Sequence, residues 1–329
     1  MLTRSLGVFL LFGVAVAVTG CTAAVTGRPS PNAAAVVQIQ EERTPLTSDR
    51  ALGDLSTIDY CSLFDAAAVE KGGADNVGEL QQSFGECTVS AKLSGQAITV
   101  EVGFLDKNAT GRIPDPTKRL PRGLVAQRDL NAGPDVCTTN LAFPDRVSVE
   151  IYTYVDDVSN TVSGSQALCQ VNSAVLDRMV TAVTQKKVAH LTFAPGTLGT
   201  VDACALISDS RVTQEIGMPM RHDENPAKHR CQWKITSSGP RATLWFYAEN
   251  PSPAVPGTTT ETIAGRQSIV QKLSGNYCLV TTVVGPYAAK SGENETAGVY
   301  VNMLSAVPKD ACGVARALAN VAWPQLPSS

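Results

Sequence analysis

Alternation of apolar and polar residues predicts four strands in the first half of the chain. Residues 87–93 and 97–104 alternate with a period of two, and Gly95 lies at the turn between them. A third strand is expected around Cys137 and a fourth over 147–152. The second half repeats this order, with strands predicted over 231–235, 242–247, 278–284 and 298–303.

Helical signals flank both sets of strands. Asp65 and Ser208 are placed to cap short helices that stop at Gly72 and Gly217. Each half then closes on a longer helix with a single apolar stripe: Leu168, Val171, Val175, Met179 and Val183, or Ala311, Val314, Leu318 and Val321. The order helix, two strands, loop, two strands, helix predicts an α+β unit, an antiparallel sheet of about four strands with flanking helices.

The two halves are copies of one unit. Residues 55–63, LSTIDYCSL, return as 198–206, LGTVDACAL, at an offset of 143 (198 − 55). The other cysteines keep nearly that offset: 144 from Cys87 to Cys231, 141 from Cys137 to Cys278, and 143 from Cys169 to Cys312. The repeat predicts two tandem homologous units over 55–190 and 198–325, joined by a linker over 191–197.

The N-terminal residues are typical of an export signal. Arg4 precedes a short apolar run over 6–18. Residues 18–21, Val-Thr-Gly-Cys, resemble the lipobox of bacterial lipoproteins, which implies a signal peptide over 1–20 and a lipid on Cys21. The alternative is an ordinary signal peptide that happens to contain a cysteine. Residues 21–54, biased toward Ala, Thr and Pro, are expected to form a flexible tether behind the lipid anchor.

Eight cysteines remain besides Cys21, four in each copy. An even number at repeated spacing in an exported chain predicts structural disulfides. Duplication suggests that each copy closes on itself, and we favour pairing that ties each flanking helix to a strand: Cys61–Cys87, Cys137–Cys169, Cys204–Cys231 and Cys278–Cys312. The alternative is a zinc or redox site, but no Cys-x-x-Cys is present and the spacings fit no zinc ligand set.

The Asp-x-Cys-x-Leu motifs at 59–63 and 202–206, behind a lipobox and a Pro/Ala/Thr spacer, carry a family resemblance. With Cys231-Gln232-Trp233 at the second cysteine, the chain resembles uncharacterised actinobacterial (mycobacterial-type) lipoproteins built from a cysteine-paired domain of unknown function. The first copy departs from this pattern, because Cys87-Thr88-Val89 lacks the tryptophan. The resemblance implies a cell-envelope location and no known activity. A looser similarity of build links the units to extracellular sensor domains of actinobacterial receptor kinases.

Composition limits the classes of function. The chain has 329 residues, 43% of them hydrophobic, and a net charge of −3. That length fits about two domains, and the absence of a basic excess argues against nucleic acid as a partner. No nucleophile elbow, zinc-protease helix or phosphate-binding loop is present. An enzyme is therefore not expected, nor a cofactor.

Two groups of side chains remain as candidates for metal or ligand binding. His222 and His229 lie near Asp223 and Glu224, but their spacing matches no metalloenzyme motif, so a solvated loop is favoured over a metal site. Trp233, Trp245, Phe246 and Tyr247 would either line a ligand cleft or fill a core. By alternation, Trp245 and Tyr247 share one sheet face and Phe246 takes the other.

The two copies differ most in the loop between their second and third predicted strands. Residues 106–122 carry five basic and two acidic side chains, whereas residues 249–261 carry no basic one. We expect Arg112, Lys118, Arg119 and Arg122 to meet an anionic envelope component, such as phospholipid headgroups or an acidic glycopolymer. The alternative is a loop that only keeps the surface soluble.

Together these patterns predict a lipoprotein at the extracytoplasmic face of the cell membrane. Its expected role is non-catalytic binding or an accessory one, with an envelope protein, lipid or glycopolymer as partner. One alternative is a carrier or sensor for a lipid or small molecule. The other is a hydrolase or metal-dependent enzyme of the envelope.

Overall fold

The computed structural model describes residues 44–107, 112–129, 133–157, 164–223, 225–236, 239–249, 257–273, 276–288, 292–303 and 309–328. The expected signal peptide, Cys21 and most of the expected tether lie outside these residues. The chain divides into two units, Met1–Glu41 and Glu42–Ser329, and the second unit holds both repeats. Everything described below belongs to that second unit.

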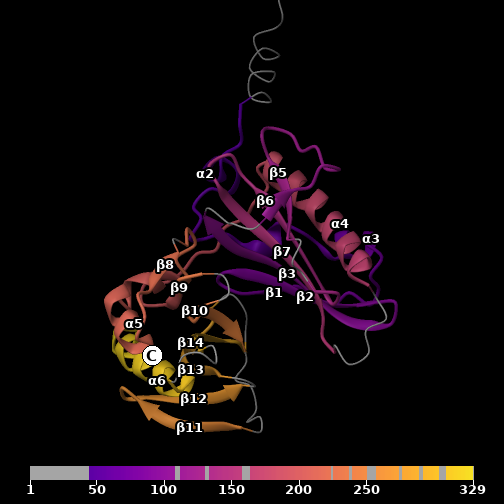
Figure 1. Ribbon diagram of the computed structural model, residues 1–329. Coiled ribbons are helices and arrows are strands. Elements are labelled where there is room, and N and C mark those ends of the chain that lie inside the picture. Colours follow the sequence, from indigo (N-terminus) through magenta and orange to yellow (C-terminus); the bar gives the residue numbers. More distant parts are fainter. Residues whose placement is uncertain are drawn as a thin grey trace, which may run out of the picture. The chain divides into compact units, whose positions relative to one another are not determined.

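Each repeat forms one antiparallel sheet of seven strands (Figure 1). The strand order is β1-β2-β3-β7-β6-β5-β4 in the first repeat, and β8-β9-β10-β14-β13-β12-β11 in the second. The two orders are the same when read along equivalent strands, so the duplication seen in the sequence extends to the topology. The expectation of about four strands per sheet was too low, and the protein is mainly β.

The four predicted strands form the centre of each sheet, and three further strands widen it. In the first repeat the strands are β1 (Gln81–Gln82), β2 (Glu86–Leu93), β3 (Gln96–Lys107), β4 (Arg112–Pro114), β5 (Val125–Asp129), β6 (Val136–Ala142) and β7 (Val147–Val155). In the second they are β8 (Arg221–Asp223), β9 (Arg230–Lys234), β10 (Arg241–Glu249), β11 (Thr258–Ile263), β12 (Arg266–Leu273), β13 (Tyr277–Pro286) and β14 (Asn294–Asn302).

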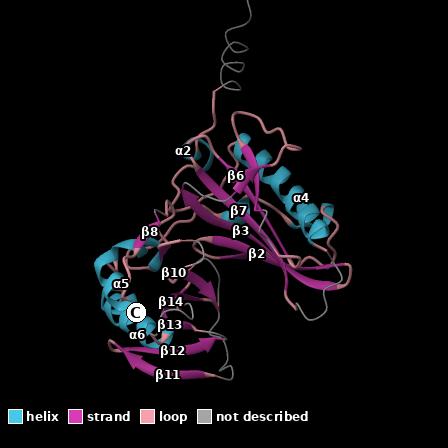
Figure 2. Cartoon of the chain, in the orientation of Figure 1, coloured by secondary structure: helices cyan, strands magenta, loops and turns pink. Residues whose placement is uncertain are grey.

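The closing helices cover one face of each sheet. Helix α4 (Ser165–Thr184) contacts β6 and β7, and α6 (Ala311–Ala322) contacts β13 and β14 (Figure 2). The predicted stripe of α4, from Leu168 to Val183, is fully buried against the sheet. In the part of the chain that the structure describes, no helix covers the other face of each sheet, and we call it the open face (Figure 2). Among the described residues, no helix has both the length and the hydropathy that a membrane span needs.

The short helices begin and end where their capping residues predict. Asp65 accepts a hydrogen bond from the Ala68 N–H at the start of α3 (Ala66–Lys71). Ser208 does the same for Arg211 in α5 (Asp209–Ile216), which ends at Gly217 with a φ of 87°. The remaining short elements are α2 (Ser48–Leu52) and the 3-10 turns η1 (Tyr60–Ser62), η3 (Leu198–Thr200), η4 (Ala203–Ala205) and η5 (Trp323–Gln325).

The repeated Asp-x-Cys motif is a local cap followed by a disulfide. Asp59 and Asp202 each accept a hydrogen bond from the backbone N–H two residues later, at 2.9 Å. The four disulfides join the expected pairs: Cys61–Cys87, Cys137–Cys169, Cys204–Cys231 and Cys278–Cys312. They close loops of 26 to 34 residues, each worth roughly 3–4 kcal/mol in the chain-entropy model.

The first repeat begins before Leu55, so the predicted tether was too long. Leu46 and Leu52 are fully buried in the core of the first repeat. The N–H and hydroxyl of Ser48 both donate to the Asp145 carboxylate, at 2.9 and 2.7 Å. A short segment that buries two leucines is not visible in local composition, because its partners lie far along the chain.

Candidate functional site

The segment before β2 packs the first repeat against the second. Phe84 is buried in the core of the second repeat, where its ring lies 5.2 Å from that of Tyr287. The Ser83 hydroxyl accepts a hydrogen bond from the Ala248 N–H at 3.0 Å. These contacts hold Glu86, the next residue but one after Phe84, above the open face of the second sheet.

Two adjoining clefts lie over this open face. The larger has a volume of about 1080 Å³ and lies between β10, β12 and β13 on one side and the β1–β2 edge of the first repeat on the other. The smaller has a volume of about 560 Å³ and is lined by the open faces of both sheets. Glu86 and Trp245 line both clefts, so the two meet at these side chains.

A row of aromatic rings forms part of the cleft floor. The ring centre of Trp245 lies 5.9 Å from that of Tyr247 and 6.2 Å from that of Tyr300. Gly298, on the neighbouring strand, makes room for this row: a Cβ added there would lie 3.1 Å from the Tyr247 ring and 3.3 Å from the Trp245 ring. The glycine lets both rings lie across β14. Phe246, the residue between them, is buried in the core as the alternation predicted.

The wall of the larger cleft is made mainly of uncharged hydrogen-bonding side chains. Its amide and hydroxyl groups come from Gln81, Gln82, Ser83, Thr88, Thr258, Thr260, Gln267, Gln271, Thr281, Thr282 and Thr296. Arg266 also lines it, but its guanidinium donates to the carbonyl oxygens of Trp323, Leu326 and Pro327 at 2.6–3.0 Å. That cation is therefore committed to the C-terminal segment.

The smaller cleft is charged. Glu86, Glu101, Glu150, Arg230 and Arg241 all line it. Burial raises the pKa of Glu86 to about 8, nearby Glu101 adds to the rise, and Arg230 opposes it. Burial also lowers the pKa of Arg230, although Glu150 and Glu86 act in the other direction. At neutral pH, Glu86 is therefore mostly protonated.

Arg230 interacts with a ring from the other repeat. Its guanidinium carbon lies 4.9 Å from the ring centre of Phe104. This is within the range of a cation–π contact, which is worth about 2 kcal/mol or more when the pair is desolvated. Phe104 follows Gly103, where β3 has an irregular register against β7. The contact therefore joins the smaller cleft to the backbone irregularity of the first sheet.

The basic side chains expected to form an anion-binding loop do not gather at one place. Arg112 lies on the open face of the first sheet and donates to Glu150 at 2.6 Å and Asn140 at 2.5 Å. Lys118 pairs with Asp177 of α4 at 2.6 Å. Arg122 donates to the Thr44 carbonyl at 3.2 Å, and Arg119 is exposed. Three of the four have partners within the chain, and the anion site stays a prediction.

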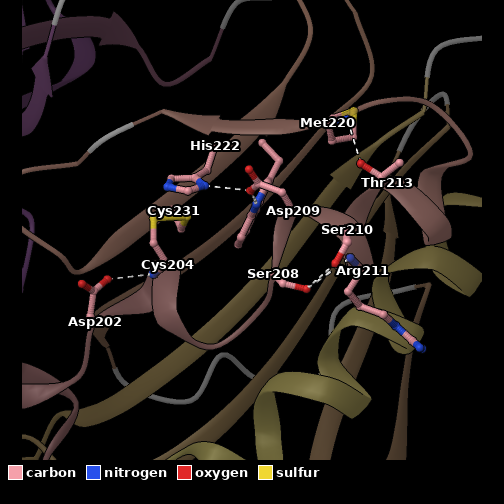
Figure 3. A network of polar contacts seen from close by, with 11 residues as sticks. Asp202, Cys204, Ser208, Asp209, Ser210, Arg211, Thr213, Met220, His222 and Cys231 are labelled. Atoms are coloured by element: carbon pink, nitrogen blue, oxygen red, sulfur yellow. Dashed lines mark hydrogen bonds and ion pairs between the residues drawn. A yellow bond between two sulfur atoms is a disulfide. The ribbon is translucent and has the colours of Figure 1, made fainter.

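The histidines considered as metal ligands are separated. The His222 ring faces Asp209, with Nδ1 at 2.7 Å from the carboxylate (Figure 3). The Trp233 indole N–H donates to the same oxygen at 2.9 Å. His229 is buried at the contact between the repeats, with its ring nitrogens 3.1 and 3.2 Å from the carbonyl oxygens of Phe84 and Gly199. In the described part of the chain, no three His, Cys, Asp or Glu side chains are grouped to hold a metal.

The Asp209–His222 pair is a structural contact between α5 and β8. Burial raises the pKa of Asp209, but the hydrogen bonds from His222 and Trp233 outweigh it and lower that pKa overall. The nearby Ser208 hydroxyl caps α5 and lies 3.0 Å from the Ser210 hydroxyl. It therefore already serves the helix terminus. The pair ties helix, strand and the buried Trp233 together.

The sequence identified one part of the cleft and missed the rest. Alternation placed Trp245 and Tyr247 on one face, but left open whether that face was core or cleft. Tyr300, Gly298 and Glu86 were not singled out, because their approach depends on strand register and on contact between the repeats. The lack of an equivalent to Trp245 in the first copy was the available signal.

Comparisons with known proteins leave the family of this chain open. No protein-family model matches it, and neither does any curated protein sequence. A solved structure of the di-domain ARO/CYC StfQ from the steffimycin biosynthetic pathway aligns over 82% of this chain and 97% of its own, with 10% identity and a TM-score of 0.17. MucB in complex with MucA(peri) aligns over 75% and 88%, with 9% identity and a TM-score of 0.13. At these TM-scores neither alignment indicates a shared fold or function.

Proposed function

We propose that this protein is a lipid-anchored envelope protein that binds a polar ligand, without converting it, in the clefts over the open face of the second sheet. The observation that carries the proposal is the row of rings at Trp245, Tyr247 and Tyr300, lying along the two adjoining clefts that both repeats build. Clefts between structural units, lined by aromatic side chains and a few converging polar groups, are the usual sites for ligands.

The lining favours a polar ligand over a lipid chain. An acyl chain in the larger cleft would strip water from amides and hydroxyls without replacing their hydrogen bonds, at a cost of about 1–3 kcal/mol for each group left unpaired. The apolar side chains of both repeats instead form two cores between sheet and helices. Ligand binding in the open clefts is therefore preferred to lipid carriage inside a unit.

Binding is preferred to hydrolysis because the carboxyl groups of the smaller cleft do not divide into an acid and a base. Burial raises the pKa of Glu86, Glu101 and Glu150 alike. Two-carboxylate hydrolysis needs one group that stays ionised beside one that stays protonated. Glu150 is also held by Arg112, and Glu101 by the Tyr154 hydroxyl at 3.1 Å.

Tryptophan fluorescence offers a direct test of the cleft. The chain has three tryptophans, and Trp233 and Trp323 are fully buried. Trp245 is therefore the one that a soluble quencher such as acrylamide reaches from the cleft. An envelope extract that contains the ligand should protect Trp245 from quenching and shift its emission. If no extract of the producing cell's envelope changes the quenching, the proposed binding function is wrong.

The anchor rests on the lipobox and is tested separately. Cys21→Ala should move the protein from the membrane fraction to the soluble fraction and abolish incorporation of a labelled fatty acid. Thr22→Ala, at the neighbouring position, should leave both unchanged. A C21A variant that stays in the membrane fraction would contradict lipid anchoring without affecting the cleft.

A further inference from the structure

Resting on the proposed function, we infer that the larger cleft binds a neutral carbohydrate, an oligosaccharide whose sugar rings stack on Trp245 and Tyr247. A sugar ring has two kinds of surface: C–H groups on its faces and hydroxyls around its rim. The cleft offers a matching pair, with flat aromatic rings on the floor and amide and hydroxyl groups on the wall.

The floor is shaped for stacking rather than for filling a core. Trp245 and Tyr247 lie on the side of β10 opposite the buried Phe246, and Gly298 lets their rings lie across the adjacent strand. Aromatic side chains bury a large area with few degrees of freedom, so a preformed ring floor binds a flat apolar face at little cost in entropy. The row continues through Tyr300 into the smaller cleft. That arrangement suits a chain of several rings.

The wall is shaped for hydroxyls rather than for ions. Glutamine amides and threonine hydroxyls both donate and accept hydrogen bonds, as sugar hydroxyls do. Among the described residues that line the larger cleft, the charged ones are Glu86, Glu249 and Arg266. Arg266 is committed to backbone carbonyls, and burial raises the pKa of both glutamates, for Glu86 to about 8.

The larger cleft offers almost no free cations, and this favours a carbohydrate over other ligands that stack on aromatic rings. Single-stranded nucleic acids also stack their bases on aromatic side chains, but their binding grooves carry lysines and arginines along the backbone path. Acidic glycopolymers need the same cations. A neutral sugar chain needs no cations, and among the described residues that line the larger cleft the only cation is Arg266.

The test uses the purified protein with neutral tetrasaccharides of glucose, mannose and galactose, followed by acrylamide quenching and calorimetry. We expect at least one of them to protect Trp245, with an affinity that barely changes between 50 and 500 mM salt. Tyr247→Ala keeps the fluorescent reporter and should weaken binding at least tenfold. Tyr154→Ala, an aromatic on the open face of the first sheet, is the matched control and should bind normally. Thermal unfolding should confirm that both variants fold.

A second arm separates this inference from the proposed function. Envelope extract is treated with periodate, which cleaves vicinal diols of sugars, and its protection of Trp245 is measured again. Loss of protection supports the carbohydrate even if no tetrasaccharide in the panel binds. Protection that survives periodate, together with a panel that does not bind, overturns the carbohydrate while the binding function stands. No protection by any extract overturns both.

Discussion

Three neighbouring strands place equivalent residues side by side on the open face of each repeat: Glu86, Gly103 and Glu150 in the first, and Arg230, Trp245 and Gly298 in the second. The strand pairing is the same at these positions, although β3 has an irregular register after Gly103 and Phe104 has a φ of 47°. Phe104 donates its N–H to the Gly85 carbonyl at 2.9 Å, and Phe246 donates to the His229 carbonyl at the same distance. The largest difference between the copies at these positions is in the side chains.

In the first repeat this patch carries no aromatic ring, and its glutamates line the smaller cleft. A Cβ added to Gly103 would lie 2.3 Å from the Gly85 carbonyl oxygen, so the strand has no room for a ring there. Across the strand, Glu150 is held by Arg112. In the second repeat the register places Thr258 where the first has Arg112. The glycine of the second patch is Gly298 on β14, at the position equivalent to Glu150, and the Trp245 ring lies over it.

The comparison shows that duplication preserved the strand order and the disulfides and changed the side chains of one patch. The first repeat uses it for an ion pair, the second for an aromatic floor. An acidic residue, Glu86, and a basic residue, Arg230, occupy equivalent strand positions and line the same small cleft. The two copies therefore contribute different side chains from the same strand position. The proposed ligand binding belongs to the copy whose patch carries the aromatic rings.

Removing a disulfide should have the largest effect on stability, because each disulfide closes a long loop in the fold that both repeats share. Replacing Cys278 and Cys312 together by alanine should lower the free energy of unfolding by about 3–5 kcal/mol, measured by chemical denaturation. The equivalent pair, Cys137 and Cys169, is the matched control and should lose a similar amount. A loss below about 1 kcal/mol in one repeat would show that the two repeats do not depend equally on their disulfides for stability.

The pH dependence of stability should report Glu86, whose folded pKa of about 8 lies above its usual value of 4.5. A raised carboxyl pKa means that the folded state binds more protons than the unfolded state between these values, so stability falls as pH rises through that window. Relative to Glu86→Gln, the wild type should lose up to about 3 kcal/mol between pH 5 and pH 7.5. Glu70→Gln, at an exposed position of α3, is the control. A parallel pH course for wild type and E86Q would contradict the buried, protonated carboxyl.

Giving the second repeat the residue of the first should remove its function. Trp245→Gly should weaken ligand binding by about 2 kcal/mol, roughly thirtyfold, because the stacking surface is lost. Calorimetry measures the change. Tyr152→Ala, at the position equivalent to Tyr300, should cost far less. Equal losses in the two variants would mean that both open faces bind the ligand.

Breaking the ion pair of the first patch should destabilise the protein without touching the larger cleft. Arg112→Ala leaves the Glu150 carboxylate half-buried and without its partner, at a cost of about 1–2 kcal/mol in unfolding free energy at pH 7. The cost should shrink at acidic pH, since Glu150 is then protonated. Lys118→Ala removes an exposed ion pair and should cost at most about 0.5 kcal/mol. If R112A lowers the free energy of unfolding no more than K118A does, the Arg112–Glu150 ion pair does not stabilise the first repeat more than an exposed pair would.

The basic loop should give the smallest effect. Reversing Arg119 to glutamate should weaken binding of the protein without its lipid to anionic phospholipid vesicles by about 1 kcal/mol or less. The Asn76→Glu variant, which places a negative charge on an exposed turn elsewhere in the first repeat, controls for net charge. Vesicle binding that is the same for R119E and wild type would remove the anion-binding hypothesis.

The elements that sequence reasoning missed share a physical cause. The hairpin of β11 and β12 turns at Ala264 and Gly265, both with positive φ, but β11 is an edge strand rich in threonine and shows little apolar alternation. Strands of two or three residues, such as β1 and β8, are too short for any period to show. Local patterns therefore found the centre of each sheet and not its edges.

The sequence by itself determined the duplication, the capped helices and the central strands, and it favoured the disulfide pairing that the structure shows. These depend on local periodicity, on capping residues and on spacing that two copies repeat. Only the tertiary structure decided that Trp245 and Tyr247 lie on the floor of a cleft and not in a core. That outcome depends on register between strands tens of residues apart and on Phe84 crossing into the second core, 145 residues from its partner His229. Contacts at such separations leave no period in the sequence, because each is made once.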